Sequence, residues 1–244
     1  MGLARVADLD RVDLGIDTAA DDASLALLRG DEVIAQRAWH VDSTMSKELL
    51  AHLDALLVEA GVTRQQIASI AVTNGPGTYG AVRTGLATAQ GLALALDVPL
   101  AGIGRFEADA ALYLADLEPG RVVIATHDTG RAGIAWAAYT QDAPGEAPRC
   151  LVEPDIAAAE DVVRLAPSPA TWCGETNEAL REALAAARDS GRRSGDTDAG
   201  MSVGGRAAAL VRIARARQAY GDPALVDAFY LRPPSITRAK PREA

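Results

Sequence analysis

The sequence has few cysteines and no long apolar run, and each shortage excludes a class of protein. Cys150 and Cys173 are its only cysteines, too few and too far apart for a Cys-x-x-Cys pair or a disulfide framework. This usage is typical of a protein that works in a reducing cytoplasm. No apolar run approaches the roughly 20 residues that span a bilayer. The N-terminal segment carries Asp8, Asp10 and Asp13 and lacks an apolar stretch, so we expect no secretory signal.

Positive charge is also in short supply, because 24 Lys and Arg residues stand against 33 Asp and Glu residues and leave a net charge of −9. A protein that holds a nucleic-acid backbone by itself normally carries a basic stripe, since phosphate contacts supply most of that affinity. The candidates lie toward the C-terminus: Arg206, Arg212, Arg215, Arg217, Arg232, Arg238, Lys240 and Arg242. Such charge runs usually form a solvated helix face or a loose tail, so we expect weak nucleic-acid binding.

The first half of the sequence contains an ordered series of buried strands and amphipathic helices. The 244 residues, 49% of them apolar, can form one large domain or two modest lobes. Short apolar runs predict strands at 12–17, 23–29, 32–39, 67–73 and 98–103. Helical spacing predicts helices from near Ser46 to Ala60, over 78–96 and over 107–116. Three strands, helix, strand, helix, strand and helix is the order of a ribonuclease-H-like lobe.

A similar cycle begins again in the second half. Residues 122–126 and 133–140 predict a hairpin around 128–131, and helices are expected over 177–188 and 206–220. The glycine-rich stretch 189–205 is expected to be a mobile loop. We therefore predict an α/β protein with a first ribonuclease-H-like lobe at 12–104, a second, smaller lobe at 105–232 and flexible termini at 1–11 and 233–244. The helix at 206–220 is able to pack back on the first lobe.

The stretch Gly75-Pro76-Gly77 predicts a tight turn between a strand and a long helix, because glycine permits backbone angles that other residues avoid. Unpaired amides at the start of such a helix attract anions, so a phosphate site is one interpretation. The helix indicates another, because Ala81, Gly85 and Ala89 form a face of small residues. A glycine inside a helix costs about 1 kcal/mol relative to alanine. Close packing against another helix, from the same lobe or from a partner, would compensate for it.

Three segments together resemble the TsaB family, also called YeaZ: GIDTAADDASLAL at 15–27, GPGTYGAVRTGLATAQGLALALDVPLAGI at 75–103 and FYLRPP at 229–234. TsaB is the dimerisation subunit of the bacterial complex that makes threonylcarbamoyladenosine in tRNA. The resemblance implies the two-lobed fold shared by actin, sugar kinases and Hsp70, in agreement with the strand order above. It also implies a non-catalytic, cytoplasmic protein.

The resemblance further implies the partners and the surface that binds them. The expected partner is a TsaD-like catalytic subunit, with which the chain forms a heterodimer. A TsaE-like ATPase is expected in the full complex, and tRNA is contacted only through that complex. When the chain is alone, a homodimer is expected. The interface is expected on the helix that begins near Ser46 and on the helix at 78–96. Its expected residues are Leu49, Leu50, Leu53, Ala81, Gly85 and Ala89.

The catalytic paralogue, TsaD, holds a metal ion with two histidines four residues apart on one helix, a spacing that puts both side chains on the same face. The matching positions here are Arg105 and Asp109, and a protonated guanidinium is no metal ligand. The three histidines, His40, His52 and His127, are scattered along the chain. The resemblance therefore implies no metal, no catalytic residue and no cofactor of the chain's own.

The sequence leaves a nucleotide site open. In the wider superfamily an aspartate on the first strand lies near phosphate and magnesium. Asp17, Thr18 and Ser24 stand where that loop is expected, and Asp128 could be the matching carboxylate of the second lobe. They predict a vestigial site with weak ATP or ADP binding; alternatively, they only cap a turn. One rival function is a self-sufficient ATP-dependent small-molecule kinase or acyl transferase of the same fold, and another is a homodimeric scaffold with other partners.

Overall fold

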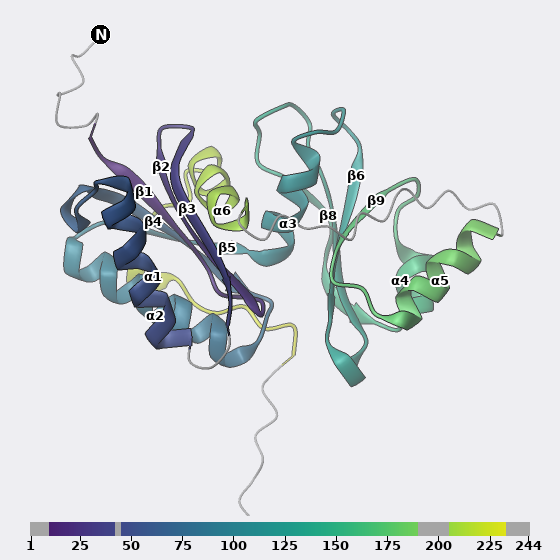
Figure 1. Cartoon of the computed structure of the whole chain (residues 1–244). Helices are drawn as coiled ribbons and strands as arrows, with labels where there is room; N and C mark the ends of the chain where they lie inside the picture. The colour runs from purple at the N-terminus through teal and green to yellow at the C-terminus, as the bar shows by residue number, and fades with distance from the viewer. Residues whose placement is uncertain (1–9, 42–44, 190–204, 233–244) are drawn as a thin grey trace, which may run out of the picture.

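The computed structural model describes residues 10–41, 45–189 and 205–232, which form two β-sheets with helices between and outside them (Figure 1). The first sheet has five strands in the order β3-β2-β1-β4-β5. They are β1 (Val12–Asp17), β2 (Asp22–Arg29), β3 (Glu32–His40), β4 (Ile67–Gly75) and β5 (Leu100–Gly104). β1 is antiparallel to β2 and parallel to β4, and β4 is parallel to β5. The five strands predicted for this half of the chain are confirmed.

The alternation of side chains along each strand explains why helices cover both faces of the first sheet. In β2, Leu25 and Leu27 join one apolar cluster, whereas Ala26 and Leu28 join another. The first cluster includes the buried sides of α1 (Met45–Ala60) and α2 (Tyr79–Leu96). The second includes α6 (Gly205–Ala216). The first sheet is therefore the middle layer of a three-layer arrangement.

Small residues allow α6 to lie close to the first sheet. A Cβ atom at Gly15 in β1 would overlap the backbone carbonyl group of Ala207. Ala207, Ala208 and Ala209 of α6 are all buried in the apolar cluster that α6 shares with the sheet. Because the distance between packed elements depends on side-chain size, these residues bring α6 into contact with β1, β2 and β4.

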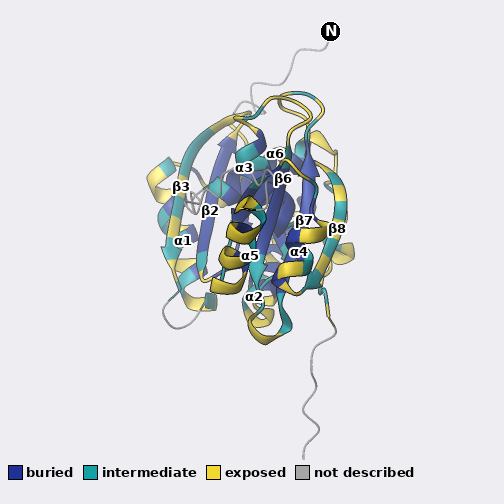
Figure 2. Ribbon diagram, turned by 90° about the vertical axis from the view of Figure 1, so that its right-hand side faces the viewer, coloured by how far each residue is buried: buried dark blue, intermediate teal, exposed yellow. Residues whose placement is uncertain are grey.

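The second sheet has four strands in the order β8-β7-β6-β9. They are β6 (Val122–Asp128), β7 (Ile134–Thr140), β8 (Arg149–Ala157) and β9 (Thr171–Gly174). The predicted hairpin is confirmed, since β6 and β7 pair antiparallel. α4 (Ala159–Leu165) and α5 (Glu178–Asp189) cover the outer face of this sheet. Figure 2 looks onto that face and shows exposed sides of α4 and α5 in front of the buried strands β6 and β7.

The sequence did not predict β8, β9 or α4, and each has a physical reason. β8 is an edge strand whose side chains alternate between exposed and half-buried, and it contains Pro154, which an edge strand tolerates. β9 has four residues and α4 has seven, so neither carries enough repeats to show a period. These elements are held by contacts with the rest of the second sheet.

The helix α3 (Arg105–Leu114) lies between the two sheets (Figure 1). It packs against β6, β7 and β9 on one side and against α6 and β5 on the other. We call the first sheet with α1, α2 and α6 the first lobe, and the second sheet with α4 and α5 the second lobe. The two-lobed α/β fold predicted from the sequence is confirmed.

Parts of the sequence-based description fall on the remaining residues. The predicted mobile loop at 189–205 lies almost entirely outside the described residues, as do most of the termini predicted to be flexible. Three short 3₁₀ helices complete the described chain: η2 (Arg64–Gln66), η3 (Gly130–Ala132) and η4 (Pro223–Leu225). Within 10–41, 45–189 and 205–232, no helix is long and apolar enough to cross a membrane.

Candidate functional site

Asp17, the predicted phosphate-loop aspartate, ends β1 and is fully buried. Its Oδ1 atom accepts hydrogen bonds from the backbone N–H of Ala19 at 3.1 Å and from the Thr73 hydroxyl at 2.6 Å. Its Oδ2 atom lies 2.7 Å from Nε of Arg206. Both oxygens are therefore occupied by groups of the chain itself, so the carboxylate faces no solvent.

The other residues predicted for a nucleotide site are buried or bonded to other parts of the chain. Thr18 and Ser24 are buried, and the Thr18 hydroxyl donates to the carbonyl of Ala81 in α2 at 2.8 Å. Asp128, at the end of β6, accepts from the backbone N–H of Gly130 at 3.0 Å and from the Asn177 side chain at 3.1 Å. Asp128 thus shapes the turn before β7, and none of these contacts joins it to Asp17.

Arg105, at the first of the two positions where TsaD has a metal-binding histidine, is completely buried. Its NH2 group donates to Glu175 Oε1 at 2.5 Å. Its NH1 group donates to the carbonyl of Ala19 at 3.3 Å and lies 3.0 Å from Nδ1 of His127. The same His127 nitrogen lies 2.6 Å from Glu175 Oε2. One guanidinium therefore fills the space between the turn after β1 and the ends of β6 and β9.

Asp109, at the second position, lies between two arginines. Its Oδ2 is 3.6 Å from Nε of Arg105, and its Oδ1 is 3.5 Å from NH1 of Arg206. Complete burial raises the pKa of Asp109, and the two guanidinium groups oppose that rise. Burial also acts to raise the pKa of Glu175, but His127 and Arg105 outweigh it and lower this pKa to about 2.

These residues do not fit a metal ion of the TsaD type. Arginine has no lone pair to offer while it is protonated, and both oxygens of Asp109 face guanidinium groups in the core. His127 points its Nδ1 at Glu175 and Arg105 rather than toward another histidine. We therefore assign no metal-dependent step to this part of the chain.

The glycine turn packs against two other segments. Gly75 has φ 119°, a backbone angle that residues other than glycine rarely adopt. A Cβ atom at Gly75 would overlap the carbonyl of Phe229, and one at Gly77 would overlap the carbonyl of Ala19. The backbone N–H of Phe229 donates to the carbonyl of Asn74 at 2.7 Å. The glycine turn is thus held closely between the β1–β2 turn and the C-terminal segment, which contains Phe229. Thr78 is the N-cap residue of α2, without a side-chain capping bond.

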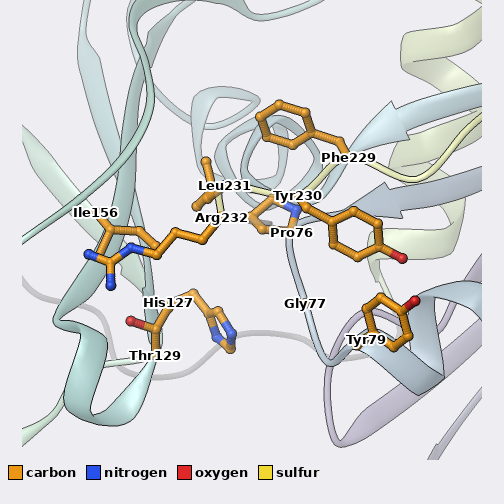
Figure 3. A pocket seen from close by; sticks show the side chains of 10 residues that line it. All are labelled: Pro76, Gly77, Tyr79, His127, Thr129, Ile156, Phe229, Tyr230, Leu231 and Arg232. Carbon is orange, nitrogen blue, oxygen red and sulfur yellow. The ribbon is translucent and has the colours of Figure 1, made fainter. Parts of the chain in front are cut away.

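A pocket of about 620 Å³ opens at the junction of the lobes (Figure 3). We call it the junction pocket. Its walls come from the start of α2, the ends of β6 and β8, and the C-terminal segment. The lining residues are Pro76, Gly77, Tyr79, His127, Thr129, Ile156, Phe229, Tyr230, Leu231 and Arg232. Aromatic rings form one side in Figure 3, while His127, Thr129 and Arg232 lie toward the second lobe.

The structure places four of the six predicted interface residues in the core of the first lobe, and the interface itself stays a prediction. Leu49, Leu53 and Ala89 are at most 1% exposed and belong to the core between α1, α2 and the first sheet. Gly85 is buried as well, because a Cβ atom there would overlap the Thr18 side chain. The small face at 81, 85 and 89 therefore packs inside its own lobe. Of the six predicted residues, Leu50 is 49% exposed and Ala81 is half-buried.

The exposed sides of α1 and α2 form a surface of which the sequence-based prediction named only Leu50. Its large apolar side chains are Leu50 and Val58 on α1 and Tyr79 and Leu94 on α2, exposed by 42–82%. Between them on α2 runs a second row of small residues, Gly80, Thr84, Ala87 and Gly91. We call these eight residues the α1–α2 surface. The spacing of that row was visible in the sequence, but periodicity alone does not tell which of two small rows faces the sheet.

An aromatic group borders this surface and the junction pocket. The rings of Tyr79 and Tyr230 stack with centroids 5.2 Å apart. The guanidinium of Arg83 lies 4.2 Å from the centre of the Tyr79 ring, and its Nε donates to the Tyr230 hydroxyl at 2.9 Å. The C-terminal segment is thereby fixed against the first turn of α2.

Comparison with known proteins gives consistent matches. The family model described as TsaD, tRNA N6-adenosine threonylcarbamoyltransferase, matches residues 40–169. The tRNA threonylcarbamoyladenosine biosynthesis protein TsaB of Bacillus subtilis is 35% identical over 98 residues, which are 40% of this chain and 43% of that protein. The tRNA N6-adenosine threonylcarbamoyltransferase of Chlorobium limicola is 34% identical over 109 residues, 39% of this chain and 31% of that protein.

A solved structure adds the fold. YeaZ from Pseudomonas aeruginosa superposes with a TM-score of 0.70 and 22% identity over 91% of this chain and 100% of that chain. The alignments with the two curated relatives span less than half of the length of each. The family model, in contrast, covers more than half of this chain. The chain therefore belongs to the TsaD family and, within it, resembles the TsaB proteins.

Proposed function

We propose that this chain is the non-catalytic, TsaB-type subunit of a complex that makes threonylcarbamoyladenosine in tRNA, and that it pairs with and supports a TsaD-like catalytic subunit. The observation that carries the proposal is that Arg105 and Asp109 are held in buried ion pairs. Both stand where the catalytic paralogue has metal ligands. A chain of this family without those ligands needs a partner that has them.

The α1–α2 surface is the proposed docking site for that partner. Exposed apolar side chains gathered on one face of a protein usually mark a site of interaction. Here four of them lie on α1 and α2, which contact each other. Figure 1 shows these two helices on the side of the first lobe away from the second lobe. The matched residues 40–169 include α1 and α2, so we expect a TsaD-like partner to present an equivalent helix pair to this surface.

The row of small residues supports a close helix–helix contact. A Cβ atom at Gly80 or at Gly91 would meet no other heavy atom within 4 Å, so both positions are open on the described surface. Gly91 lies inside α2, where a glycine costs the helix about 1 kcal/mol relative to alanine. A partner helix that packs closely along this row would compensate for that cost, because small residues permit short distances between helix axes.

The remaining parts of the assembly follow from the same proposal. We place the complex in the cytoplasm and include a TsaE-like ATPase as a further member. We expect tRNA to be bound only through the complex. When the partner is missing, we expect a homodimer through the α1–α2 surface. No resident cofactor is expected. Any weak ATP or ADP binding would have to use the junction pocket, since Asp17 has both oxygens engaged.

The test compares two exposed leucines. Leu94 lies on the α1–α2 surface and is 65% exposed, while Leu165 at the end of α4 is 54% exposed. We expect Leu94→Asp to abolish pairing with the TsaD-like protein of the same organism, measured by size-exclusion chromatography with light scattering. Leu165→Asp is the matched control and should pair like the wild type. Normal pairing by Leu94→Asp, or equal loss in both variants, would contradict the proposed docking site.

A further inference from the structure

Arg105 and Arg206 are the largest fully buried side chains among the described residues, and Arg105 makes contacts on both sides of the junction. In the first lobe, its NH1 donates to the carbonyl of Ala19, in the turn between β1 and β2, at 3.3 Å. In the second lobe, its NH2 donates to Glu175 Oε1 at 2.5 Å, and its NH1 lies 3.0 Å from His127 Nδ1. A single side chain thus bonds both lobes.

The position of Arg105 in the chain makes these contacts mechanically important. Arg105 is the first residue of α3, which leads from β5 of the first sheet toward β6 of the second. Glu175 follows directly after β9, and His127 lies in β6. The guanidinium therefore joins the adjacent ends of two strands in one lobe to a turn in the other.

A second guanidinium extends the network into α6. Arg206 pairs with Asp17 in β1 at 2.7 Å and with Asp109 in α3 at 3.5 Å, and its NH2 donates to the carbonyl of Asp22 at 3.3 Å. Asp109 also lies 3.6 Å from Arg105, so it links the two arginines. We call Arg105, Asp109, Glu175, His127, Arg206 and Asp17 the junction network. Loss of Arg105 would remove the cation beside Glu175 and one of the two beside Asp109, and loss of Arg206 would leave the buried Asp17 without its cation.

We propose that Arg105 fixes the angle between the two lobes. Two-lobed proteins commonly open and close around a cleft by a hinge motion, and contacts between lobes of one chain permit such motion unless they are strong. Here ion pairs and hydrogen bonds at the centre of the junction add to the packing of α3 on both sheets. Arg105 occupies the place at which a cleft would open. This inference concerns the chain itself and does not rest on the proposed function.

The experiment measures the distance between the lobes. Gln65 in η2 and Glu182 in α5 are exposed on the first and second lobe, respectively, and can be replaced by cysteine in a Cys150→Ser background for spin labelling. The wild-type chain should give one narrow distance distribution by pulsed electron paramagnetic resonance. Arg105→Met keeps an unbranched side chain, shorter than that of arginine, but removes its charge and its fork of donors. It should add a second population at a shifted distance.

Two further variants keep the test decisive. Glu175 is 41% exposed, so Glu175→Ala disturbs the core less, and it should shift the distribution in the same direction even if Arg105→Met does not fold. Arg215→Met is the matched control, because Arg215 pairs with Asp13 inside the first lobe, and its distribution should stay that of the wild type. A wild-type distribution in both folded Arg105→Met and Glu175→Ala, or the same change in Arg215→Met, would overturn the proposal.

Discussion

Arg206 Nε lies 2.7 Å from Asp17 Oδ2, and neither side chain is exposed by more than 1%. Asp17 was predicted from the sequence as part of a vestigial nucleotide site. In this chain that aspartate is neutralised from within by a helix that comes from the other end of the described sequence. The pair turns a position associated with ligand chemistry into part of the core.

The first prediction concerns what Asp17 does. Asp17→Ala leaves Arg206 as a buried cation without its main partner, and breaking a buried pair in this way typically costs about 3–5 kcal/mol. We expect a loss of that order in the free energy of unfolding, measured by urea denaturation. Asp54→Ala, which breaks an exposed pair with Arg64, is the control and should cost no more than about 1 kcal/mol.

The same variant separates the proposed function from the kinase-like rival. The isolated wild-type chain should show no ATP hydrolysis above background, so Asp17→Ala has no such activity to lose. Robust ATPase activity in the wild type that disappears in a stably folded Asp17→Ala variant would favour the rival.

The second prediction contrasts two glycines of α2. Gly85→Leu should lower the melting temperature of the isolated chain, since overpacking a core costs about 1–3 kcal/mol and the new side chain collides with Thr18. Gly91→Leu points into open space and should leave the melting temperature unchanged or slightly raised, because it removes a glycine from a helix. Gly91→Leu should nevertheless weaken partner binding. Scanning calorimetry and light scattering measure the two effects, and a strongly destabilised Gly91→Leu would contradict the assignment of the outer row.

The third prediction is a pH dependence caused by Glu107. Burial raises the pKa of Glu107 to about 7 from its ordinary value of 4.5, although the Arg217 guanidinium, 2.6 Å from Oε2, opposes the rise. Between these two pH values the folded chain holds a proton that the unfolded chain has released. Stability should therefore fall as the pH rises from about 4.5 to about 7 and then level off, by at most about 3 kcal/mol for this group.

Glu107→Gln tests that dependence. The amide cannot ionise, so this contribution to the slope of stability against pH should vanish, as measured by urea denaturation at several pH values. Glu182→Gln, on the exposed side of α5, is the control and should keep the wild-type slope. An unchanged slope in Glu107→Gln would show that Glu107 is ionised throughout the range, held by Arg217.

The fourth prediction concerns tRNA. Three arginines of the basic segment are engaged within the protein: Arg206 pairs with Asp17, Arg215 with Asp13, and Arg217 with Glu107. With a net charge of −9 as well, the isolated chain should bind tRNA only in the range of non-specific affinity, roughly 1–100 μM at physiological salt. A gel shift at submicromolar protein that is lost in Arg212→Gln would show instead that the exposed side of α6 binds RNA.

The sequence predicted the first lobe well because its elements are long enough to show a period. Leu49, Leu53 and Leu56 identified α1, and the apolar run from Ile67 identified β4. The rotation of α2 about its axis, which decides which face is buried, was not predictable in the same way. The row of residues through Gly85 and the row through Gly91 both consist of small residues. Only the position of Thr18 on the neighbouring turn decides which row is buried.

The junction network could not be predicted from the sequence at all. Arg105 and Asp109 were noted only as replacements for metal ligands, while Arg206 was counted with a solvated basic face. Their partners lie far away in the chain: Arg105 meets Glu175, and Arg206 meets Asp17. Such contacts depend on how the two sheets pack around α3, and no local pattern encodes that arrangement.

The most direct test of the central claim is the formation of threonylcarbamoyladenosine in tRNA by purified components. Reactions contain unmodified tRNA, the threonylcarbamoyl donor and ATP, a TsaE-like ATPase, and either this chain, the TsaD-like protein of the same organism, or both. The account predicts no modified nucleoside with this chain as the only TsaD-family protein, and a large increase when this chain is added to the TsaD-like protein. Modification by this chain without a TsaD-like protein, or no effect of adding it, would contradict the account.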